Sequence, residues 1–267
     1  MAGIMAVIRL HALTDVGRVR TGNEDCVYAD PGGRFALLAD GMGGANAGEV
    51  ASHMAVDTIR ARLTAAMAHA ELPIVDELQE QLLIGIEEAQ RQIRTRAQRD
   101  AACVGMGTTV VAVVLAADQL IVAHVGDSRL YRWRAGEFRA LTKDHSLVQL
   151  HVDQGLLTAD EARSSSQKNI LLQVLGSEQM PVIATAVHEL QDGDRYLLCS
   201  DGLNDLLSDQ EIGTLLGNSW MGQKERAQAL VDAANQLGGR DNVSVVLVDV
   251  GGDQTGGWRD KLKQWWR

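Results

Sequence analysis

Apolar residues recur at helical spacing in two long segments of the N-terminal half. The first stripe follows Asn46 and consists of Val50, Ala51, Met54, Ala55, Ile59, Leu63 and Met67. This spacing predicts an amphipathic helix over about residues 47–70. The second stripe follows Pro73 and consists of Leu78, Leu82, Ile86, Ala89, Ile93 and Ala97. Two long helices in succession predict an antiparallel helical pair.

The remaining pattern is one of short apolar or β-branched runs separated by turn residues. We expect a first strand in the N-terminal segment up to Leu13, and further strands at about 108–115, 120–125, 128–134, 137–141, 182–189, 195–199 and 242–250. Helices are expected near 209–217 and 223–237, whereas residues 142–178 are poorly patterned. Strands joined by hairpins, with helices grouped between them, indicate an α+β fold of antiparallel sheets covered by helices.

Composition narrows the possible functions. The chain has 267 residues, of which 46% are hydrophobic, so it can bury a sizeable core. Its formal net charge of −10 argues against binding to nucleic acid or to an anionic membrane. No apolar run reaches the roughly 18 residues that a membrane span requires. Cys26, Cys103 and Cys199 form no CxxC pair, which favours reduced thiols and a cytoplasmic location.

Residues 1–250 contain no repeat or internal linker and are expected to form one domain. Residues 251–257 are rich in glycine and are predicted to be a flexible linker. In the tail that follows, Trp258, Leu262 and Trp265 would share a helical face among four basic residues. Two interpretations are open: a docking or membrane-surface helix, or a tail that folds back on the domain or stays disordered.

An apolar run ends at Asp40, and four glycines follow among residues 41–48. A glycine-rich loop between a strand and a helix can bind a pyrophosphate on its backbone N–H groups. The dinucleotide pattern GxGxxG is not met, because Asn46 stands at its last position. A carboxylate directly before the loop would also repel phosphate unless a cation lay between them. A Rossmann-like nucleotide-binding enzyme is therefore disfavoured.

Carboxylates recur at the ends of several predicted strands. One such position alone is explained by a turn, since Asp-Gly is a common turn pair. The recurring positions are Glu24 with Asp25, Asp40, Asp127, Asp201 and Asp241. If these strand ends converge, their oxygen atoms can bind hard divalent cations such as Mg²⁺ or Mn²⁺.

The ordered set of motifs resembles the metal-dependent serine/threonine protein phosphatases, the PPM or type 2C family, in its bacterial single-domain form. The similarity covers about residues 9–250 and rests on Arg20-x-x-Asn-Glu-Asp25, Asp40-Gly-Met-Gly-Gly44, Gly107-Thr-Thr109, Val125-Gly-Asp-Ser-Arg129, Leu141-Thr-Lys-Asp-His-Ser146, Cys199-Ser-Asp-Gly202 and Gly239-Arg-Asp-Asn-Val243. It implies a four-layer sandwich of two antiparallel β-sheets flanked by antiparallel helical pairs. It also implies a flap at about 145–175 and a binuclear Mn²⁺/Mg²⁺ centre at one edge of the sandwich.

The resemblance assigns the metal ligands residue by residue. Asp40 would bridge two metal ions. Asp201 and Asp241 would complete the coordination of one ion, and Glu24 and the backbone carbonyl of Gly41 would serve the other. A side chain at position 41 would hinder the close approach of this backbone.

Two further residues receive roles from the same resemblance. Asp127, together with Asp201, would hold a third, weaker ion; the alternative for Asp127 is a turn residue that orients Arg129. Arg20 would bind the non-bridging phosphate oxygens, for which a planar guanidinium is well suited.

The implied function is hydrolysis of phosphoserine and phosphothreonine in proteins by a metal-bridged hydroxide, without a phosphoenzyme. The expected cofactors are two Mn²⁺ or Mg²⁺ ions and a third, weaker one. The expected partners are phosphorylated proteins, including a cognate serine/threonine kinase, and the chain is expected to be a monomer. The alternative is a catalytically silent phosphoprotein-binding domain of the same fold. Loss of metal ligands would favour that alternative, but every expected acidic position is present.

Two positions depart from the family pattern. Met42 stands where other members carry the candidate leaving-group acid, a histidine directly after Asp-Gly. Ser165-Ser-Gln-Lys-Asn169 replaces the His-Pro-x-Arg-Asn of many bacterial relatives near the flap. His145 is the motif histidine nearest to the site, and we expect it to have a structural hydrogen-bonding role. Cys199 lacks the CxxxxxR loop of cysteine phosphatases, since Asp205 stands where that pattern requires arginine.

Overall fold

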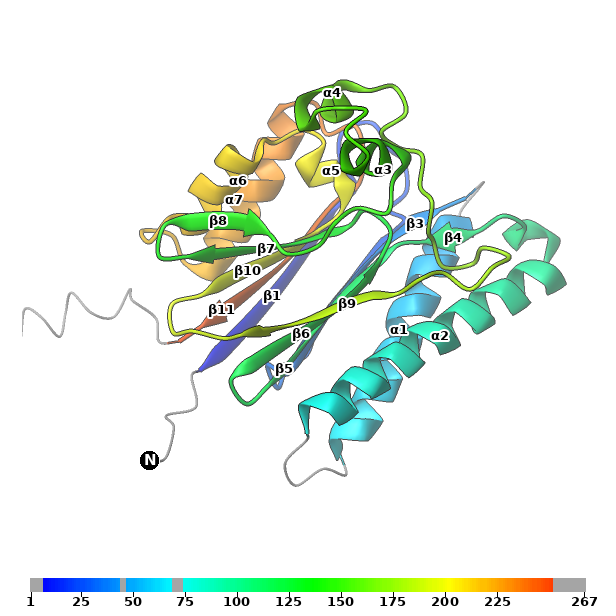
Figure 1. Ribbon diagram of the computed structural model, residues 1–267, viewed down its shortest axis with the longest axis horizontal. Helices are drawn as coiled ribbons and strands as arrows, with labels where there is room; N and C mark the ends of the chain where they lie inside the picture. Colours follow the sequence, from blue (N-terminus) through cyan, green and yellow to red (C-terminus); the bar gives the residue numbers. More distant parts are fainter. Residues whose placement is uncertain (1–6, 44–46, 69–73, 252–267) are drawn as a thin grey trace, which may run out of the picture.

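The computed structural model describes residues 7–43, 47–68 and 74–251. Two antiparallel β-sheets lie face to face, and helices cover the outer face of each (Figure 1). The predicted four-layer α+β sandwich is therefore confirmed. The tail predicted at 251–267 lies outside the described residues except for Gly251, and its two interpretations stay predictions. In the described part of the chain, no helix combines the length and the apolar character that crossing a membrane requires.

The first sheet has five strands in the order β1-β11-β10-β7-β8. Their bounds are β1 (Ile8–Asp15), β11 (Val243–Val250), β10 (Arg195–Cys199), β7 (Arg129–Arg134) and β8 (Glu137–Ala140). The N-terminal and C-terminal strands are thus neighbours, with Ile8 opposite Val250. This pairing joins the first and last strands of the domain within one sheet.

The second sheet has the order β2-β3-β5-β6-β9, and the short strand β4 pairs with the end of β3. Their bounds are β2 (Asp25–Ala29), β3 (Phe35–Met42), β4 (Gly107–Thr108), β5 (Val110–Ala116), β6 (Gln119–Val125) and β9 (Ala184–Glu189). The hairpin between β5 and β6 turns at Ala117, whose φ of 53° lies in the left-handed region.

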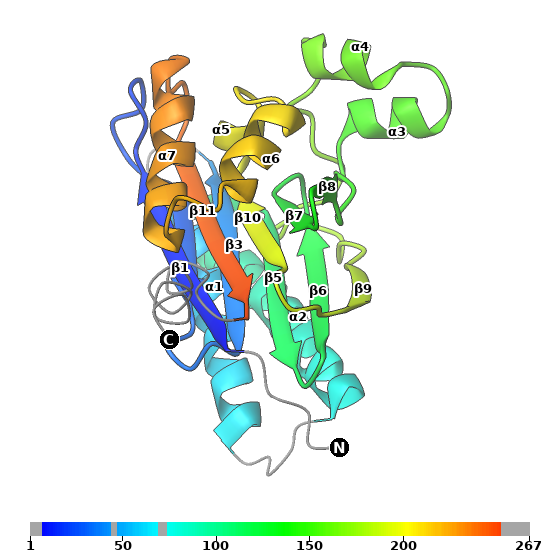
Figure 2. The ribbon, with the colours of Figure 1, turned by 90° about the vertical axis from the view of Figure 1, so that its left-hand side faces the viewer.

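The helices form two groups on opposite sides of the sheets (Figure 1). The predicted antiparallel pair, α1 (Ala47–Ala68) and α2 (Val75–Arg99), covers the second sheet and leads into the single 3₁₀ turn η1 (Ala101–Cys103). Helices α5 (Asp201–Asn204), α6 (Asp209–Gly217) and α7 (Gln223–Gln236) cover the first sheet. The poorly patterned region contains two short helices, α3 (Leu147–Asp153) and α4 (Ala159–Ser164), which project beyond the sandwich (Figure 2).

Three apolar cores lie between these four layers. In β5, Val110, Ala112 and Val114 face helices α1 and α2, whereas Val111 and Val113 face the other sheet. Both faces of the strand are therefore buried, which is why the sequence shows a continuous apolar run here instead of alternation.

Asn242, just before β11, ties its own segment to the loop between β1 and β2 at one end of the sandwich. Its Oδ1 accepts a hydrogen bond from the backbone N–H of Glu24 at 2.8 Å. Its Nδ2 donates to the backbone carbonyls of Val16 and Gly22 at 3.0 and 2.9 Å. Because Asn242 is buried, water cannot replace these bonds.

We predict that Asn242→Ala lowers the free energy of unfolding by about 2–4 kcal/mol, since it leaves buried polar groups without partners. Urea denaturation followed by circular dichroism measures the change. Asn169→Ala, at an exposed position, should change stability by no more than about 0.5 kcal/mol. Equal effects of the two substitutions would contradict the role given to Asn242.

Candidate active site

Asp40 lies near the end of β3, where two threonines hold its backbone. Thr108 Oγ1 donates to the Asp40 carbonyl at 2.8 Å, and Thr109 Oγ1 accepts from the Asp40 N–H at 3.1 Å. Thr109 Oγ1 is itself 2.7 Å from Ser128 Oγ, a buried contact. The Gly-Thr-Thr motif of β4 thus fixes the backbone from which the Asp40 carboxylate projects.

Asp25 stands directly opposite Asp40 in the β2–β3 pairing. It is 5% exposed, and its Oδ2 accepts a hydrogen bond from Ser200 Oγ at 2.8 Å. Asp25 is one of the carboxylates that recur at strand ends in the sequence, but it is not among the predicted metal ligands. The available signal was strand alternation, because Asp25 follows Glu24 and therefore points to the other face of the sheet.

Asp201 and Asp241 come from different segments that pack tightly together. Asp201 is the first residue of α5, and Asp241 lies two residues before the first residue of β11. The two segments touch at Gly202, where an added Cβ would lie 1.9 Å from the Asn242 carbonyl oxygen. A side chain at position 202 would therefore separate the two carboxylates.

Glu24 lies beside the glycines that follow Asp40. The Gly41 N–H donates to the Glu24 carbonyl at 3.1 Å. An added Cβ on Gly41 would lie 2.2 Å from the Gly48 carbonyl, and one on Gly48 would lie 2.8 Å from the Glu24 carboxylate. The close packing expected at Gly41 is thus present, and a second glycine, Gly48, makes room for the carboxylate.

Asp127 follows β6 and lies near other acidic side chains. The alternative role for Asp127, orienting Arg129, has no support among the described hydrogen bonds. The Arg129 guanidinium instead forms a bidentate pair with Asp144, at 2.8 and 2.7 Å.

The carboxylates influence one another's ionisation. Burial raises the pKa of Asp40 well above its ordinary value, and the charges of Asp25, Asp201, Asp127 and Asp241 raise it further. Burial is also the first cause for Asp201, whose pKa is raised well above its ordinary value, with Asp127 and Asp205 next. Burial raises the pKa of Asp25 to about 6 and that of Asp127 to about 7. Acidic groups from five separate segments therefore share one electrostatic environment.

Arg20 lies at the edge of this acidic group. Its Nη2 donates to Asp241 Oδ2 at 2.7 Å, and about half of its side chain is exposed. The charges of Glu24 and Asp201 also raise the pKa of Arg20, after the effect of Asp241. The predicted phosphate-binding arginine and the predicted carboxylates are therefore brought together.

The donor set fits hard divalent cations, since every predicted side-chain ligand offers carboxylate oxygen. Among the described residues, no three Asp, Glu, His or Cys side chains already form a cluster ready to hold an ion. Part of the reason is local: Asp241 Oδ2 binds Arg20, and its Oδ1 accepts from the Asn242 N–H at 2.8 Å. Each carboxylate oxygen of Asp241 thus already accepts one hydrogen bond before any cation binds.

The predicted flap segment lies over α5. Lys168 Nζ donates to Asp205 Oδ2 at 2.5 Å, and Arg163 Nη2 donates to the Leu207 carbonyl at 2.6 Å. A cavity of about 600 Å³ between this segment and α5 is lined in part by Asp127 and Asp201. The altered motif at 165–169 thus places Lys168, in place of the family's arginine, in an ion pair beside the acidic group.

The other residues considered in the sequence have structural contacts. His145 Nδ1 accepts from the Gly126 N–H at 3.2 Å, and its ring stacks on His124 at 4.7 Å between centroids. Burial lowers the pKa of His145 to about 4, so this ring is neutral at pH 7. Cys199 is fully buried, and burial raises the pKa of its thiol, which makes it a poor nucleophile. Met42 is 42% exposed at the mouth of the site.

Comparison with known proteins agrees with this arrangement. The family model for protein phosphatase 2C matches residues 20–237. The serine/threonine protein phosphatase PstP of Mycobacterium tuberculosis is 41% identical over 255 residues, which is 94% of this chain and 46% of that protein. The protein phosphatase PhpP of Streptococcus pneumoniae is 39% identical over 91% of this chain and 98% of its own length.

Solved structures show the same similarity. The catalytic domain of PstP, in complex with two manganese ions, superposes with a TM-score of 0.78 at 38% identity, over 92% of this chain and all of that domain. This chain spans less than half the length of the mycobacterial PstP proteins that it matches. Since the family model covers most of the residues and the relatives exceed 30% identity, the chain belongs to the protein phosphatase 2C family.

Proposed function

We propose that this protein hydrolyses phosphoserine and phosphothreonine in other proteins at a centre that binds two Mn²⁺ or Mg²⁺ ions. One observation carries the proposal: Asp25, Asp40, Asp127, Asp201 and Asp241 come from separate segments, and their charges act on one another. A group of partly buried carboxylates is costly unless cations compensate it. The names of the relatives and the two manganese ions of the PstP catalytic domain support the same function.

The ligands would be Asp40 between the two ions, Asp201 and Asp241 on one side, and Glu24 with the Gly41 carbonyl on the other. When bound, the ions would supply the Lewis acidity that activates the attacking water and the positive charge that offsets the phosphate. Asp127 with Asp201 would hold a third, weaker ion. After burial, the charge of Asp127 is the largest cause of the raised pKa of Asp201, which supports this arrangement.

Arg20 would bind the phosphate of the substrate. Its guanidinium already contacts Asp241, so it is positioned over the acidic group and remains half exposed to an incoming ligand. A phosphate that engages Arg20 would release Asp241 Oδ2 toward a cation. Arg20 would therefore couple phosphate binding to the orientation of a ligand carboxylate.

Met42 offers no proton, so the leaving serine or threonine oxygen must receive one from another group. Among the described groups, His145 is held by Gly126 and stacked on His124, which leaves it poorly placed as an acid. We therefore propose that water at the site protonates the leaving group.

The remaining expectations also belong to this proposal. A silent phosphoprotein-binding domain is disfavoured, because Glu24, Asp40, Asp201 and Asp241 are all retained. We propose phosphorylated proteins, including a cognate serine/threonine kinase, as substrates, and a monomeric enzyme. The three free cysteines favour a reducing, cytoplasmic compartment.

We predict that the purified protein hydrolyses p-nitrophenyl phosphate and a phosphothreonine peptide only with Mn²⁺ or Mg²⁺, and that EDTA stops both reactions. Asp40→Ala and Asp241→Ala should lower kcat by about 10²-fold or more, because they remove charge that holds the ions. Initial rates of p-nitrophenol and phosphate release measure this. Asp153→Ala, an exposed carboxylate paired with Lys143, is the matched control and should keep full activity. Turnover that persists without divalent cations would contradict the mechanism.

Without divalent cations, the free energy of unfolding should fall as the pH rises, whereas a bound cation should raise it. With EDTA, the folded state binds more protons than the unfolded state between about pH 4 and 7, because the pKa values of Asp25 and Asp127 are raised to about 6 and about 7. These groups contribute stability below pH 4 that is lost as the pH rises through 7. Asp127→Asn should therefore flatten the decline in urea-denaturation free energy over this range.

At pH 7, Mn²⁺ should offset the loss of stability that the ionised carboxylates cause. A cation that binds only the folded state adds about 2.7 kcal/mol at a hundredfold excess over its Kd. Asp40→Ala should remove most of this gain in the free energy of unfolding. This measurement of stability does not depend on catalytic activity. An equal gain in wild type and Asp40→Ala would place the cation elsewhere.

A further inference from the structure

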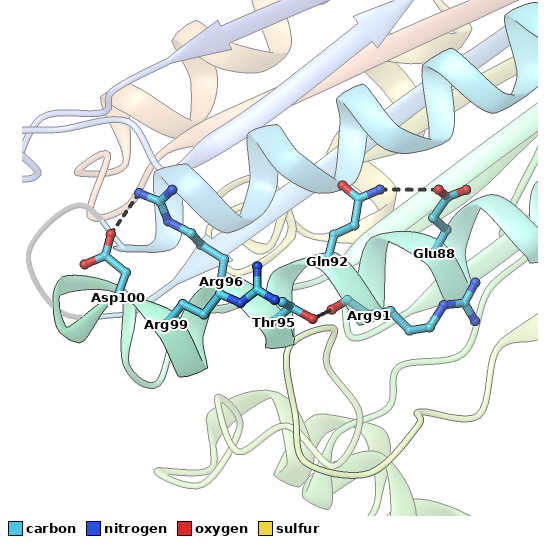
Figure 3. A pocket seen from close by; sticks show the side chains of 7 residues that line it. All are labelled: Glu88, Arg91, Gln92, Thr95, Arg96, Arg99 and Asp100. Atoms are coloured by element: carbon cyan, nitrogen blue, oxygen red, sulfur yellow. Dashed lines mark hydrogen bonds and ion pairs between the residues drawn. The ribbon is translucent and has the colours of Figure 1, made fainter.

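An arginine-rich face lies on the exposed side of the C-terminal half of α2. We define it as the Arg91–Arg99 face, after its outermost arginines, with Arg96 between them. It borders an open hollow of about 620 Å³, lined by Glu88, Arg91, Gln92, Thr95, Arg96, Arg99 and Asp100 (Figure 3). We infer that this face binds acidic side chains near the phosphorylated residue of the protein substrate, an inference that rests on the proposed function.

Charge is strictly divided along α2. Its first fourteen residues, 75–88, contain all five of its carboxylates, whereas residues 89–99 contain four arginines and no acidic residue. The whole chain has a net charge of −10, so an acidic partner is repelled by most of its surface. The Arg91–Arg99 face is a local exception to that repulsion.

Much of the charge on this face is available to a partner. Arg99 has no hydrogen bond or ion pair within the part of the chain that the structure describes. Arg96 pairs with Asp100 at 2.8 Å but stays 54% exposed, and Arg91 is 3.7 Å from Glu87. The fourth arginine, Arg94, donates instead to the Glu178 carbonyl and is excluded from the face. Planar guanidinium groups suit carboxylates, which they can bind through two parallel bonds.

A stabilising role within the helix explains only part of the pattern. Basic side chains in the last turn interact favourably with the helix dipole, which accounts for Arg96 and Arg99. This effect fades beyond the last turn and does not account for Arg91. The helix-dipole effect also does not depend on which substrate is present. A comparison of two substrates therefore distinguishes it from binding.

The face is connected to the candidate active site by a short path. Cys103 N–H donates to the Asp100 carbonyl at 2.9 Å, and Met106 N–H donates to the Cys103 carbonyl at 3.2 Å. Two residues later, Thr108 Oγ1 donates to the Asp40 carbonyl. The eight residue-to-residue steps from Asp100 to Thr108 would span at most about 28 Å when fully extended, and these turns shorten the distance. A substrate segment of eight residues or fewer can therefore reach the face while its phosphate lies at Asp40.

The test compares two phosphothreonine peptides of equal length. One carries three glutamates four to six positions from the phosphothreonine, and the other carries glutamines there. At low ionic strength, we expect wild type to have the lower KM for the acidic peptide. The double variant Arg96→Gln/Arg99→Gln should raise that KM about three- to tenfold and leave the neutral peptide unchanged, because surface charges contribute modestly each.

Controls separate this inference from the proposed function. Arg139→Gln removes one positive charge, as Arg99→Gln does, from an exposed position on β8, on the opposite side of the molecule from α2 (Figure 1), and should change neither KM. Turnover of p-nitrophenyl phosphate should be the same in all variants, and high salt should abolish the preference of wild type. Arg99→Glu should weaken binding of the acidic peptide more than Arg99→Gln does.

Two results would overturn the inference: equal KM values for both peptides in wild type, or a double variant that shifts both peptides alike. If wild type instead fails to hydrolyse p-nitrophenyl phosphate with Mn²⁺, the proposed function fails, and that outcome is distinct.

Discussion

The structure depends on the convergence of several carboxylates at one partly buried site. Asp40 and Asp25 meet across the β2–β3 pairing, and the charges of Asp201, Asp127 and Asp241 reach them from other segments. Like charges in such a place oppose folding unless something positive offsets them. The raised pKa values express this cost directly, and a pair of divalent cations is the compensation that oxygen ligands suit best.

The surrounding fold supplies the rigidity that such a group requires. Its main devices are buried hydrogen bonds from Asn242, Thr108 and Thr109, and close backbone contacts at Gly41 and Gly202. The contacts of Asn242, Thr108, Thr109 and Gly202 connect segments that are far apart in the chain, and Gly41 packs against Gly48 and Glu24. The position of the carboxylates is therefore a property of the whole sandwich and not of any single loop.

Acidic and basic side chains are also concentrated in different parts of the molecule. An acidic chain gathers carboxylates at one end of its sheets, whereas the exposed end of α2 is basic. The segment between α2 and β4 joins these two regions within a few turns. A negatively charged substrate would meet attraction at both points, provided that cations occupy the first.

The amino-acid sequence by itself determined the elements and the chemistry of this protein. The apolar stripes of α1 and α2 and the β-branched runs of β5 and β11 predicted their own structure, because local burial patterns have distinct periods. Recurrence of carboxylates at strand ends, together with the family motifs, indicated Glu24, Asp40, Asp201 and Asp241 as candidates. The two short helices α3 and α4 lacked a readable pattern, since they bury little apolar surface, and the four-residue helix α5 was not predicted either.

The tertiary structure decided which distant groups meet. The position of Asp25 opposite Asp40 became visible only from the strand register, and the partner of Arg129 proved to be Asp144. The ion pairs Arg20–Asp241 and Lys168–Asp205 join residues separated by 221 and 37 positions. Periodicity reports on neighbours along one element, whereas these contacts arise from strand pairing and layer packing, which no local pattern encodes.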